Sequence, residues 1–320
     1  MFYWRRVALA AVAAVFLTAC GRPRTVSVVY AGSLVHVMEQ SVAPAFDAAR
    51  HLHFAGQAGG SVQLAHELAA GLLQADVFVS ADPRVNALLA TGPARVNWYL
   101  GVFTNELVLA YDPQSPLAPA FAAAAAGRGP WYVPLLQPGL RLGRTDPLLD
   151  PKGYDTLIAF QLAERVTGQA DLAARVLGPA ENPAQIFPEE QLVARLQAGQ
   201  LDAAILYHSE AMDGHLPFVS LPARVNLGDP ALSAWYATAR VTVGQKTWQG
   251  APILYTMTIP ANAPDPAGGE AWIEYVVAGP GAALLHNAGL TPVPVTVGGD
   301  RAAVPAALAQ ALNLPASGPP

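Results

Sequence analysis

Short β-favouring segments alternate with helical ones along almost the whole chain, and this alternation limits the possible folds most strongly. TVSVVYA at 25–31 predicts a strand, the run at 34–43 predicts a helix, and Pro44 begins a second helical piece. Further strands are expected at 53–61, 75–82, 105–113, 201–207, 239–244 and 252–260, and helices at 62–73, 83–90, 153–168, 188–199, 269–278 and 302–313. Such a succession is typical of α/β folds with mostly parallel sheets, where ligands bind beyond the carboxyl ends of strands.

The first residues have the pattern of an export signal. Two arginines precede an apolar stretch at 7–19, which is too short to span a bilayer, and small residues lead to Cys20, the only cysteine. We therefore expect a lipoprotein signal peptide at 1–19, lipidation at Cys20 and a tether at 20–24, with the mature protein anchored in the periplasm or on the outer face of the cytoplasmic membrane. An ordinary signal peptide with an incidental cysteine is the alternative. A single cysteine also excludes an intramolecular disulfide.

Composition excludes one class of partner. The formal net charge is −5 over 320 residues, and loss of the two arginines within 1–19 makes it −7. No basic surface remains that could follow a nucleic-acid backbone. The length is typical of about two domains of roughly 150 residues, and 52 % hydrophobic residues supply a large core. We expect a monomer.

Two similar turns are the first candidates for a binding site. YAGSL at 30–34 and GGSVQ at 59–63 each end a strand on small residues and open a helix with serine. A helix start offers unpaired N–H donors and a partial positive charge, which favour an anion. The alternative is that each serine only caps its own helix. The candidates are Ala31, Gly32, Ser33, Gly60 and Ser61.

Two further segments supply candidates. In DPLLDPKGYDTL at 146–157, Asp150 and Gly153 mark a turn before a helix, so that Tyr154 could face the same cleft. Tyr207 ends the buried strand LDAAILY. The alternatives are a simple Asp-Pro turn and a packed tyrosine. Lys152 could assist anion binding from the DPKGY loop, but we expect a solvated surface lysine.

The sequence contains only incomplete versions of the known catalytic and metal-binding motifs. GGSVQ lacks the final glycine of a nucleophile elbow, and His66-Glu67 is not followed by the second histidine of a zinc protease. Neither serine has a recognisable general base. The sequence therefore predicts a protein that is not an enzyme and holds no cofactor or metal ion.

The order of these segments resembles the molybdate/tungstate-binding proteins of ABC importers, in particular their archaeal-type branch. AGSL, AGGSVQ, ADVFVSAD, NWYLGVFTNELVLAY, DPKGY, LDAAILYHSEA and GAPILYTMTIPANAP follow one another as in that family, over about residues 26–312. The most specific parts are the AGS and AGGS pair with VSAD, and DPKGY.

The resemblance implies two α/β lobes of the type II periplasmic-binding-protein fold, joined by crossover strands around a ligand cleft. Lobe 1 would comprise 25–108 and 236–313, lobe 2 would comprise 109–235, and 314–320 would form a flexible tail. Ser33 and Ser61 would bind a molybdate or tungstate oxyanion from lobe 1, and Asp150, Gly153, Tyr154 and Tyr207 would close on it from lobe 2. An ABC permease in the membrane would be the partner.

One position departs from the resembled branch. There, two carboxylates expand the coordination of the metal to six: the aspartate matching Asp150, and a glutamate immediately before the tyrosine matching Tyr207. Here that second position is Leu206. Either Glu210 or Glu189 replaces the missing ligand, with Asp150 still a ligand to molybdenum or tungsten, or the anion stays tetrahedral. The leucine favours the tetrahedral site, in which Asp150 must turn away from the dianion and cap a helix, because like charges in a dry cleft repel.

Three other functions fit the same sequence. The protein could bind sulfate, phosphate or a small organic acid. It could be a secreted serine hydrolase that uses Ser33 or Ser61. It could also feed a sensor instead of a permease.

Overall fold

The computed structural model describes residues 24–315. The predicted signal peptide, Cys20, most of the tether and the end of the predicted tail lie outside this range. Among the described residues, no helix is both long enough and apolar enough to cross a membrane.

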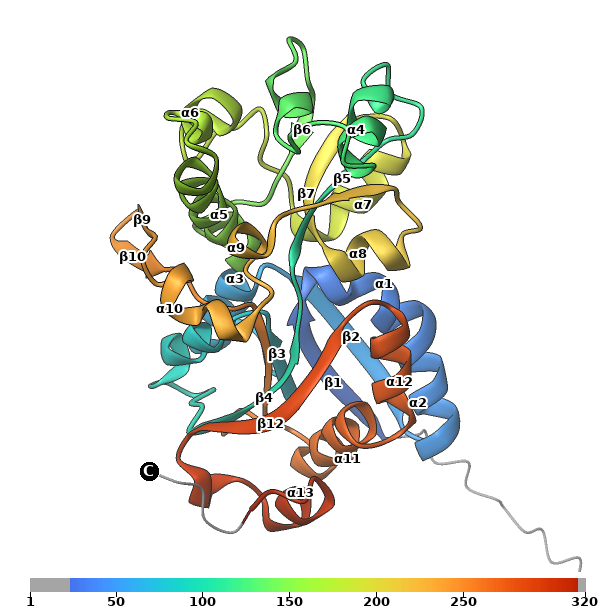
Figure 1. Ribbon diagram of the computed structural model, residues 1–320. Coiled ribbons are helices and arrows are strands. Elements are labelled where there is room, and N and C mark those ends of the chain that lie inside the picture. Colours follow the sequence, from blue (N-terminus) through green and yellow to red (C-terminus); the bar gives the residue numbers. More distant parts are fainter. Residues whose placement is uncertain (1–23, 316–320) are drawn as a thin grey trace, which may run out of the picture.

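The first sheet has the strand order β12-β4-β11-β3-β1-β2. Its strands are β1 (Thr25–Ala31), β2 (His53–Gly59), β3 (Val77–Ser80), β4 (Trp98–Thr104), β11 (Leu254–Thr258) and β12 (Thr291–Gly299). β1 pairs in parallel with both β2 and β3, so the carboxyl ends of these three strands meet at one edge of the sheet. That edge faces the second sheet, which lies above it in Figure 1.

The second sheet has the order β6-β7-β5-β8. Its strands are β5 (Leu107–Tyr111), β6 (Leu142–Gly143), β7 (Ala203–Tyr207) and β8 (Phe218–Ser220). The chain passes directly from β4 to β5 and thus from one sheet to the other (Figure 1). A separate hairpin of β9 (Arg240–Val243) and β10 (Lys246–Gln249) precedes the return to the first sheet through β11.

The α/β class and the two-sheet architecture are confirmed, but the expectation of mostly parallel sheets is wrong. Only three of the nine strand pairings in the described part of the chain are parallel. The reason is the crossing of the chain between the sheets. β11, which returns from the second sheet, runs antiparallel to β3 and β4, and β5, which enters it, runs antiparallel to β7 and β8.

Helices cover both sheets. The α-helices are α1 (Val35–Val37), α2 (Ala43–Arg50), α3 (Ser61–Ala69), α4 (Ala118–Ala125), α5 (Pro151–Thr167), α6 (Leu172–Leu177), α7 (Leu192–Gln197), α8 (His208–Asp213), α9 (Ala223–Asn226), α10 (Ser233–Tyr236), α11 (Pro266–Val277), α12 (Pro280–Asn287) and α13 (Ala306–Ala311). Short 3₁₀ helices are η1 (Gly32–Leu34), η3 (Pro83–Leu89), η4 (Val133–Leu136), η5 (Glu189–Gln191), η6 (Pro230–Leu232) and η7 (Arg301–Ala303), and η2 (Met38–Val42) is a π-helical turn.

Local signals set several boundaries. Asp82 caps η3 through a hydrogen bond from the Arg84 N–H, and Gly168 ends α5 in the left-handed conformation. The helix expected at 34–43 is present only as consecutive 3₁₀, α and π turns. The π turn η2 leads directly into α2 at Pro44, which has no N–H to continue an α-helical ladder.

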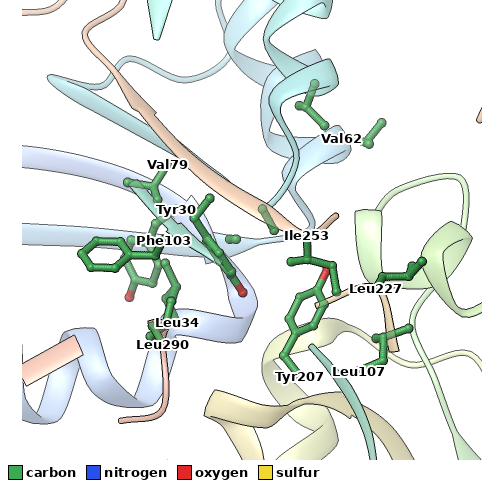
Figure 2. Close-up of a cluster of buried hydrophobic side chains, with 14 of the residues drawn as sticks. Tyr30, Leu34, Val62, Val79, Phe103, Leu107, Tyr207, Leu227, Ile253 and Leu290 are labelled. Atoms are coloured by element: carbon green, nitrogen blue, oxygen red, sulfur yellow. The ribbon is translucent and has the colours of Figure 1, made fainter. Parts of the chain in front are cut away.

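The main hydrophobic core is continuous across both sheets. Figure 2 shows Tyr30, Phe103 and Val79 of the first sheet in the same buried cluster as Leu107 and Tyr207 of the second. Successive residues of β7 point to opposite faces, so its odd positions join this core, while Leu206 packs with Leu192 and Leu196 in a second cluster. Leu206 therefore faces away from the space between the sheets.

Candidate functional site

The two predicted turns lie where the first sheet meets the second. Gly32 and Ser33 begin η1 after β1, and Gly60 precedes Ser61 at the start of α3 after β2. Gly60 is needed for close approach, because a Cβ there would lie 2.5 Å from the carbonyl oxygen of Leu149. The start of α3 is therefore packed against the loop that leads into α5.

Neither serine caps its own helix. The N-cap positions are Ala31 and Gly60, whose side chains cannot accept a hydrogen bond. Instead, Ser33 Oγ lies 2.8 Å from the hydroxyl of Tyr255, and Ser61 Oγ accepts a hydrogen bond of 3.2 Å from the Ala81 N–H. The capping alternative is thus wrong for both serines, and the hydroxyl hydrogen of Ser61, whose oxygen accepts from Ala81, remains available to a ligand.

The molecule has two halves, one built around the first sheet and one around the second. Four ionisable side chains of the second sheet's half form what we call the carboxylate cluster: Asp150, Lys152, Glu189 and Glu210. Lys152 Nζ donates to both carboxylate oxygens of Glu210, at 2.8 and 2.6 Å, and lies 3.2 Å from Glu189 Oε1. Glu210 also accepts a hydrogen bond of 2.7 Å from the Tyr207 N–H. Asp150 Oδ1 accepts one of 2.8 Å from Thr145.

All four groups of the carboxylate cluster are buried, with Lys152 completely inaccessible and no carboxylate more than 6 % exposed. Burial raises the pKa of Asp150 well above its ordinary value; the charge of Glu189 raises it further, and Lys152 lowers it. Burial also raises the pKa of Glu210 to about 7, against the opposing effect of Lys152. Three acids thus share one compensating cation in a dry space.

Several polar atoms in this space have no hydrogen-bond partner. They are Asp150 Oδ2, both carboxylate oxygens of Glu189 and the hydroxyl of Tyr207. Lys152 is near enough to Glu189 for an ion pair but is not aligned for a hydrogen bond. Buried polar groups are nearly always partnered, so this concentration of unpartnered oxygens indicates a place for a ligand.

Glu189 sits at the junction of the two halves. It begins η5 after Pro188, as the sequence predicted for a helix start, and packs against Gly32 of the first sheet's half. Two cavities of about 300 Å³ each flank it. One is lined by Gly32, Ser33, Glu189 and Glu210 among others, and the second by Gly60, Thr145, Asp150 and Glu189 among others.

Tyr154 differs from its expected role. Its hydroxyl donates a hydrogen bond of 2.6 Å to Asp82 Oδ2, and its ring stacks on Trp248 at 4.0 Å. The Arg84 guanidinium lies over both rings. We call these four residues the aromatic latch, since they join the first sheet's half, α5 and the β9–β10 hairpin. The side chain of Tyr154 is thereby committed to this contact and not to an anion.

The remaining candidates of the DPKGY turn behave in two ways. Gly153 permits a close contact, because a Cβ there would lie 2.5 Å from the backbone nitrogen of Pro147. The expectation that Lys152 is solvated is wrong, because its buried ammonium pairs with Glu210 and Glu189.

No group of three or more metal-ligating side chains arranged to hold a metal ion occurs among residues 24–315.

Comparison with known proteins adds the family. The model of the bacterial extracellular solute-binding proteins matches residues 26–291. The chain belongs to this family. It is thus an extracytoplasmic solute-binding protein of the ABC-transporter type, and its membrane partner is a permease.

Relatives of this solute-binding protein include one from Haloferax volcanii and one from Halobacterium salinarum. It is 37 % identical over 239 residues to a Haloferax volcanii protein provisionally named an ABC transporter molybdenum-binding protein, covering 73 % of this chain and 72 % of the relative. It is 33 % identical over 294 residues to an uncharacterized solute-binding protein of Halobacterium salinarum, covering 90 % of each.

Solved structures agree in fold. The periplasmic molybdate-binding protein of Azotobacter vinelandii superposes with a TM-score of 0.53 at 18 % identity, over 83 % of this chain and 98 % of that one. The sulfate-binding protein SubI of Mycobacterium tuberculosis gives 0.51 at 16 % identity, over 84 % and 87 %. At such identities the likeness shows the fold and leaves the ligand of this solute-binding protein to its own residues.

Sequence analysis missed Tyr255 and the ion pair between Lys152 and Glu210, and it named Glu210 only as an alternative ligand. Lys152 and Glu210 carry no local signal of pairing, because 58 positions separate them. Tyr255 lies in an apolar strand, where a tyrosine is usually a packing residue, and reaches Ser33 across 222 positions. Glu189 was named only as one of two alternative acids, and the structure places it beside Asp150.

Proposed function

We propose that this solute-binding protein captures molybdate or tungstate between its two halves and delivers the anion to an ABC permease. The observation that carries the proposal is the set of three carboxylate oxygens without a hydrogen-bond partner, Asp150 Oδ2 and both oxygens of Glu189, buried beside the Ser33 and Ser61 turns. The name of the Haloferax volcanii relative supports the same ligand class.

The donors for an oxyanion come from both halves. Ser33 and Ser61 present hydroxyl groups, and Tyr207 presents an unpartnered phenol. In the first turns of α3 and α5, the N–H groups of Gln63 and Gly153 already donate to backbone carbonyls, so these two helix starts offer an anion only their other N–H groups. Hydrogen bonds to a charged group contribute roughly 1.5–3 kcal/mol each, so about six offset desolvation and the closing of the two halves. Nanomolar affinity requires about −12 kcal/mol.

The carboxylates favour an anion whose central atom can accept more oxygen ligands. Molybdenum(VI) and tungsten(VI) can expand from four to six oxygen neighbours, whereas sulfur in sulfate cannot. Sulfate, molybdate and tungstate dianions meet the same repulsion from a buried carboxylate, but only the central atom of the last two can offset it by binding a carboxylate oxygen. We therefore assign these two side chains as the additional oxygen ligands.

This assignment replaces the tetrahedral site favoured by the sequence. A tetrahedral anion required Asp150 to turn away and cap a helix. Asp150 makes no side-chain capping bond to α5; it is held by Thr145 and keeps Oδ2 unpartnered. Leu206 is no obstacle, because it faces the second hydrophobic cluster while Glu189 supplies the other carboxylate.

Glu210 is a weaker choice for that ligand. Both of its oxygens are already bonded to Lys152, and one also accepts from the Tyr207 N–H. Freeing it would leave the buried ammonium of Lys152 with Glu189 alone. Its role is to hold Lys152, which in turn offsets part of the charge of Glu189.

A different oxyanion remains a second candidate for one reason. Hydrogen phosphate carries a proton and needs an acceptor, which the unpartnered oxygens of Glu189 could supply.

The proposal also includes how the protein is held and organised. It is anchored to the membrane through Cys20, it is a monomer, and its two lobes meet at 108/109 and 235/236.

The test is isothermal titration of the purified protein with molybdate, tungstate, sulfate and phosphate separately. We expect tight one-to-one binding of the first two, and X-ray absorption of the tungstate complex should give six oxygen neighbours. Binding of phosphate alone would transfer the site to that anion. No heat with any of the four would overturn the proposal.

A further inference from the structure

Tyr255 is a buried polar residue whose hydroxyl neither the hydrophobic core nor the carboxylate cluster requires. It lies in β11, is completely inaccessible to solvent, and places its hydroxyl 2.8 Å from Ser33 Oγ. Its ring meets that of Tyr207 edge-to-face, with centroids 6.0 Å apart. Two of the phenols at the junction of the two sheets are thus neighbours.

The backbone of β11 is irregular at this residue. The pairing of β11 with β4 shifts register between Tyr255 and Thr256. Irregularities of this type bend a strand and redirect its side chains, and they occur often beside functional sites. Here the irregularity falls at Tyr255, the residue whose hydroxyl contacts Ser33. In a regular apolar strand, such a side chain would be buried without a polar contact.

The direction of the hydrogen bonds follows from the chemistry of an anion. An oxyanion accepts hydrogen bonds only, so a serine that binds it must donate its single hydrogen to it. Ser33 Oγ can then receive a hydrogen bond only through a lone pair. Its neighbour Tyr255 can supply one, because burial and the charge of Glu189 raise the pKa of Tyr255 well above its ordinary value and keep the phenol protonated.

We propose that Tyr255 is a positioning residue for the bound anion: its hydroxyl donates to Ser33 Oγ and thereby commits the hydrogen of Ser33 to the ligand. A charge-assisted chain of this kind is stronger than either bond alone. The inference rests on the proposed function, since it requires an oxyanion beside Ser33. It adds a residue that acts through Ser33 and does not itself touch the ligand.

The test is a double-mutant cycle with tungstate as the titrant. Tyr255→Phe removes one hydroxyl and keeps the ring, and we expect about five- to fiftyfold weaker binding. Ser33→Ala should weaken binding at least as much. Because Tyr255 acts through Ser33, the Tyr255→Phe change should cost less than twofold when it is made in the Ser33→Ala background.

Tyr236→Phe is the matched control. Tyr236 is also a fully buried tyrosine and lies in α10, away from Ser33. Its hydroxyl donates a hydrogen bond of 2.6 Å to the Ala223 carbonyl. It should lower the melting temperature without changing affinity more than twofold. A purely structural role for Tyr255 predicts additive losses in the double mutant, and additivity or an unchanged Tyr255→Phe affinity would overturn the inference while leaving the proposed function standing. A wild-type protein that binds no oxyanion would remove both.

Discussion

The carboxylate cluster and the aromatic latch both use side chains from the first turns of α5, but they satisfy their polar groups to different extents. In the latch, Asp82 accepts hydrogen bonds from the Tyr154 hydroxyl at 2.6 Å and from the Arg84 backbone and guanidinium. In the cluster, Asp150 and Glu189 keep three buried oxygens without partners. Complete pairing is typical of a structural contact, and the concentration of unpartnered oxygens in the carboxylate cluster supports a ligand site there.

The comparison predicts opposite responses to substitution. Neutralising a carboxylate of the cluster removes repulsion within the protein and also removes a ligand contact. Removing a polar group of the latch loses a satisfied bond that holds the two halves together. Stability and affinity should therefore change in opposite directions at the cluster and in the same direction at the latch.

The largest effect is expected at the one cation of the cluster. Lys152→Met leaves Glu189 and Glu210 buried without a positive partner, and breaking a buried pair in this way typically costs about 3–5 kcal/mol of stability. Chemical denaturation monitored by circular dichroism measures it. The matched control is Lys246→Met, at the other lysine, which is partly exposed over the Trp248 ring and should change stability by about 1 kcal/mol or less. Equal effects of the two substitutions would mean that the cluster is not held by its ion pairs.

Asp150→Asn and Glu189→Gln separate binding from stability. Each should weaken tungstate binding by about a hundredfold or more, because an amide is a poor ligand for the metal; this corresponds to about 2.7 kcal/mol. Each should also raise the melting temperature of the ligand-free protein, because a repelling buried charge is removed. Titration and calorimetric melting of the same samples measure both.

Glu190→Gln provides the control for this pair. Glu190 is the next residue in η5 and lines the same two cavities, but it is exposed. It should alter neither affinity nor melting temperature appreciably. If Glu190→Gln weakened binding as strongly as Glu189→Gln, the general charge of η5 would explain the effect and the assignment of Glu189 as a ligand would be lost.

Features of the cluster and the latch could be predicted from sequence only where the interacting residues lie close together in the chain. Strand ends, small residues and the DPKGY turn are local patterns, so the turns at Ser33 and Ser61 and the position of Asp150 were identified. The pairing of Lys152 with Glu210, and that of Ser33 with Tyr255, depends on how distant segments pack. The two faces of β7 are a case in between, since alternation alone places Leu206 opposite to Tyr207, yet nothing local shows which face meets the ligand.

The raised pKa values predict how stability depends on pH. Asp150 and Glu210 hold protons more tightly in the folded than in the unfolded state, so they stabilise the fold at low pH and lose this effect as pH rises. For Glu210 the loss extends from its ordinary value of 4.5 to about 7. The unfolding free energy of the ligand-free protein should therefore fall between about pH 5 and pH 7, and Asp150→Asn should flatten this dependence. A free energy that rises across that interval in both proteins would contradict the account of the cluster.

Tyr154→Phe tests the latch. It deletes one satisfied buried hydrogen bond to Asp82, which Arg84 continues to pair, so we expect a loss of about 1–2 kcal/mol in stability. Affinity should fall only a fewfold, through a less favourable closed form. Tyr132→Phe, at a partly buried tyrosine of the second sheet's half that packs edge-to-face on Trp131, should change neither. A hundredfold loss of affinity in Tyr154→Phe with unchanged stability would instead return this side chain to the ligand site.

The smallest effect on affinity is expected at an exposed contact between the two halves. His36 of α1 pairs with Asp213 of α8 at 2.6 Å, but the His36 side chain is 55 % exposed. Exposed pairs contribute about 0–1 kcal/mol and are screened by salt, so His36→Gln should weaken tungstate binding by less than about fivefold at low salt and not at all at high salt. Titrations at two salt concentrations check this. A loss that persists at high salt would show that contact between the halves, and not the buried oxygens of Asp150 and Glu189, dominates affinity, and the contrast between cluster and latch would then have to be abandoned.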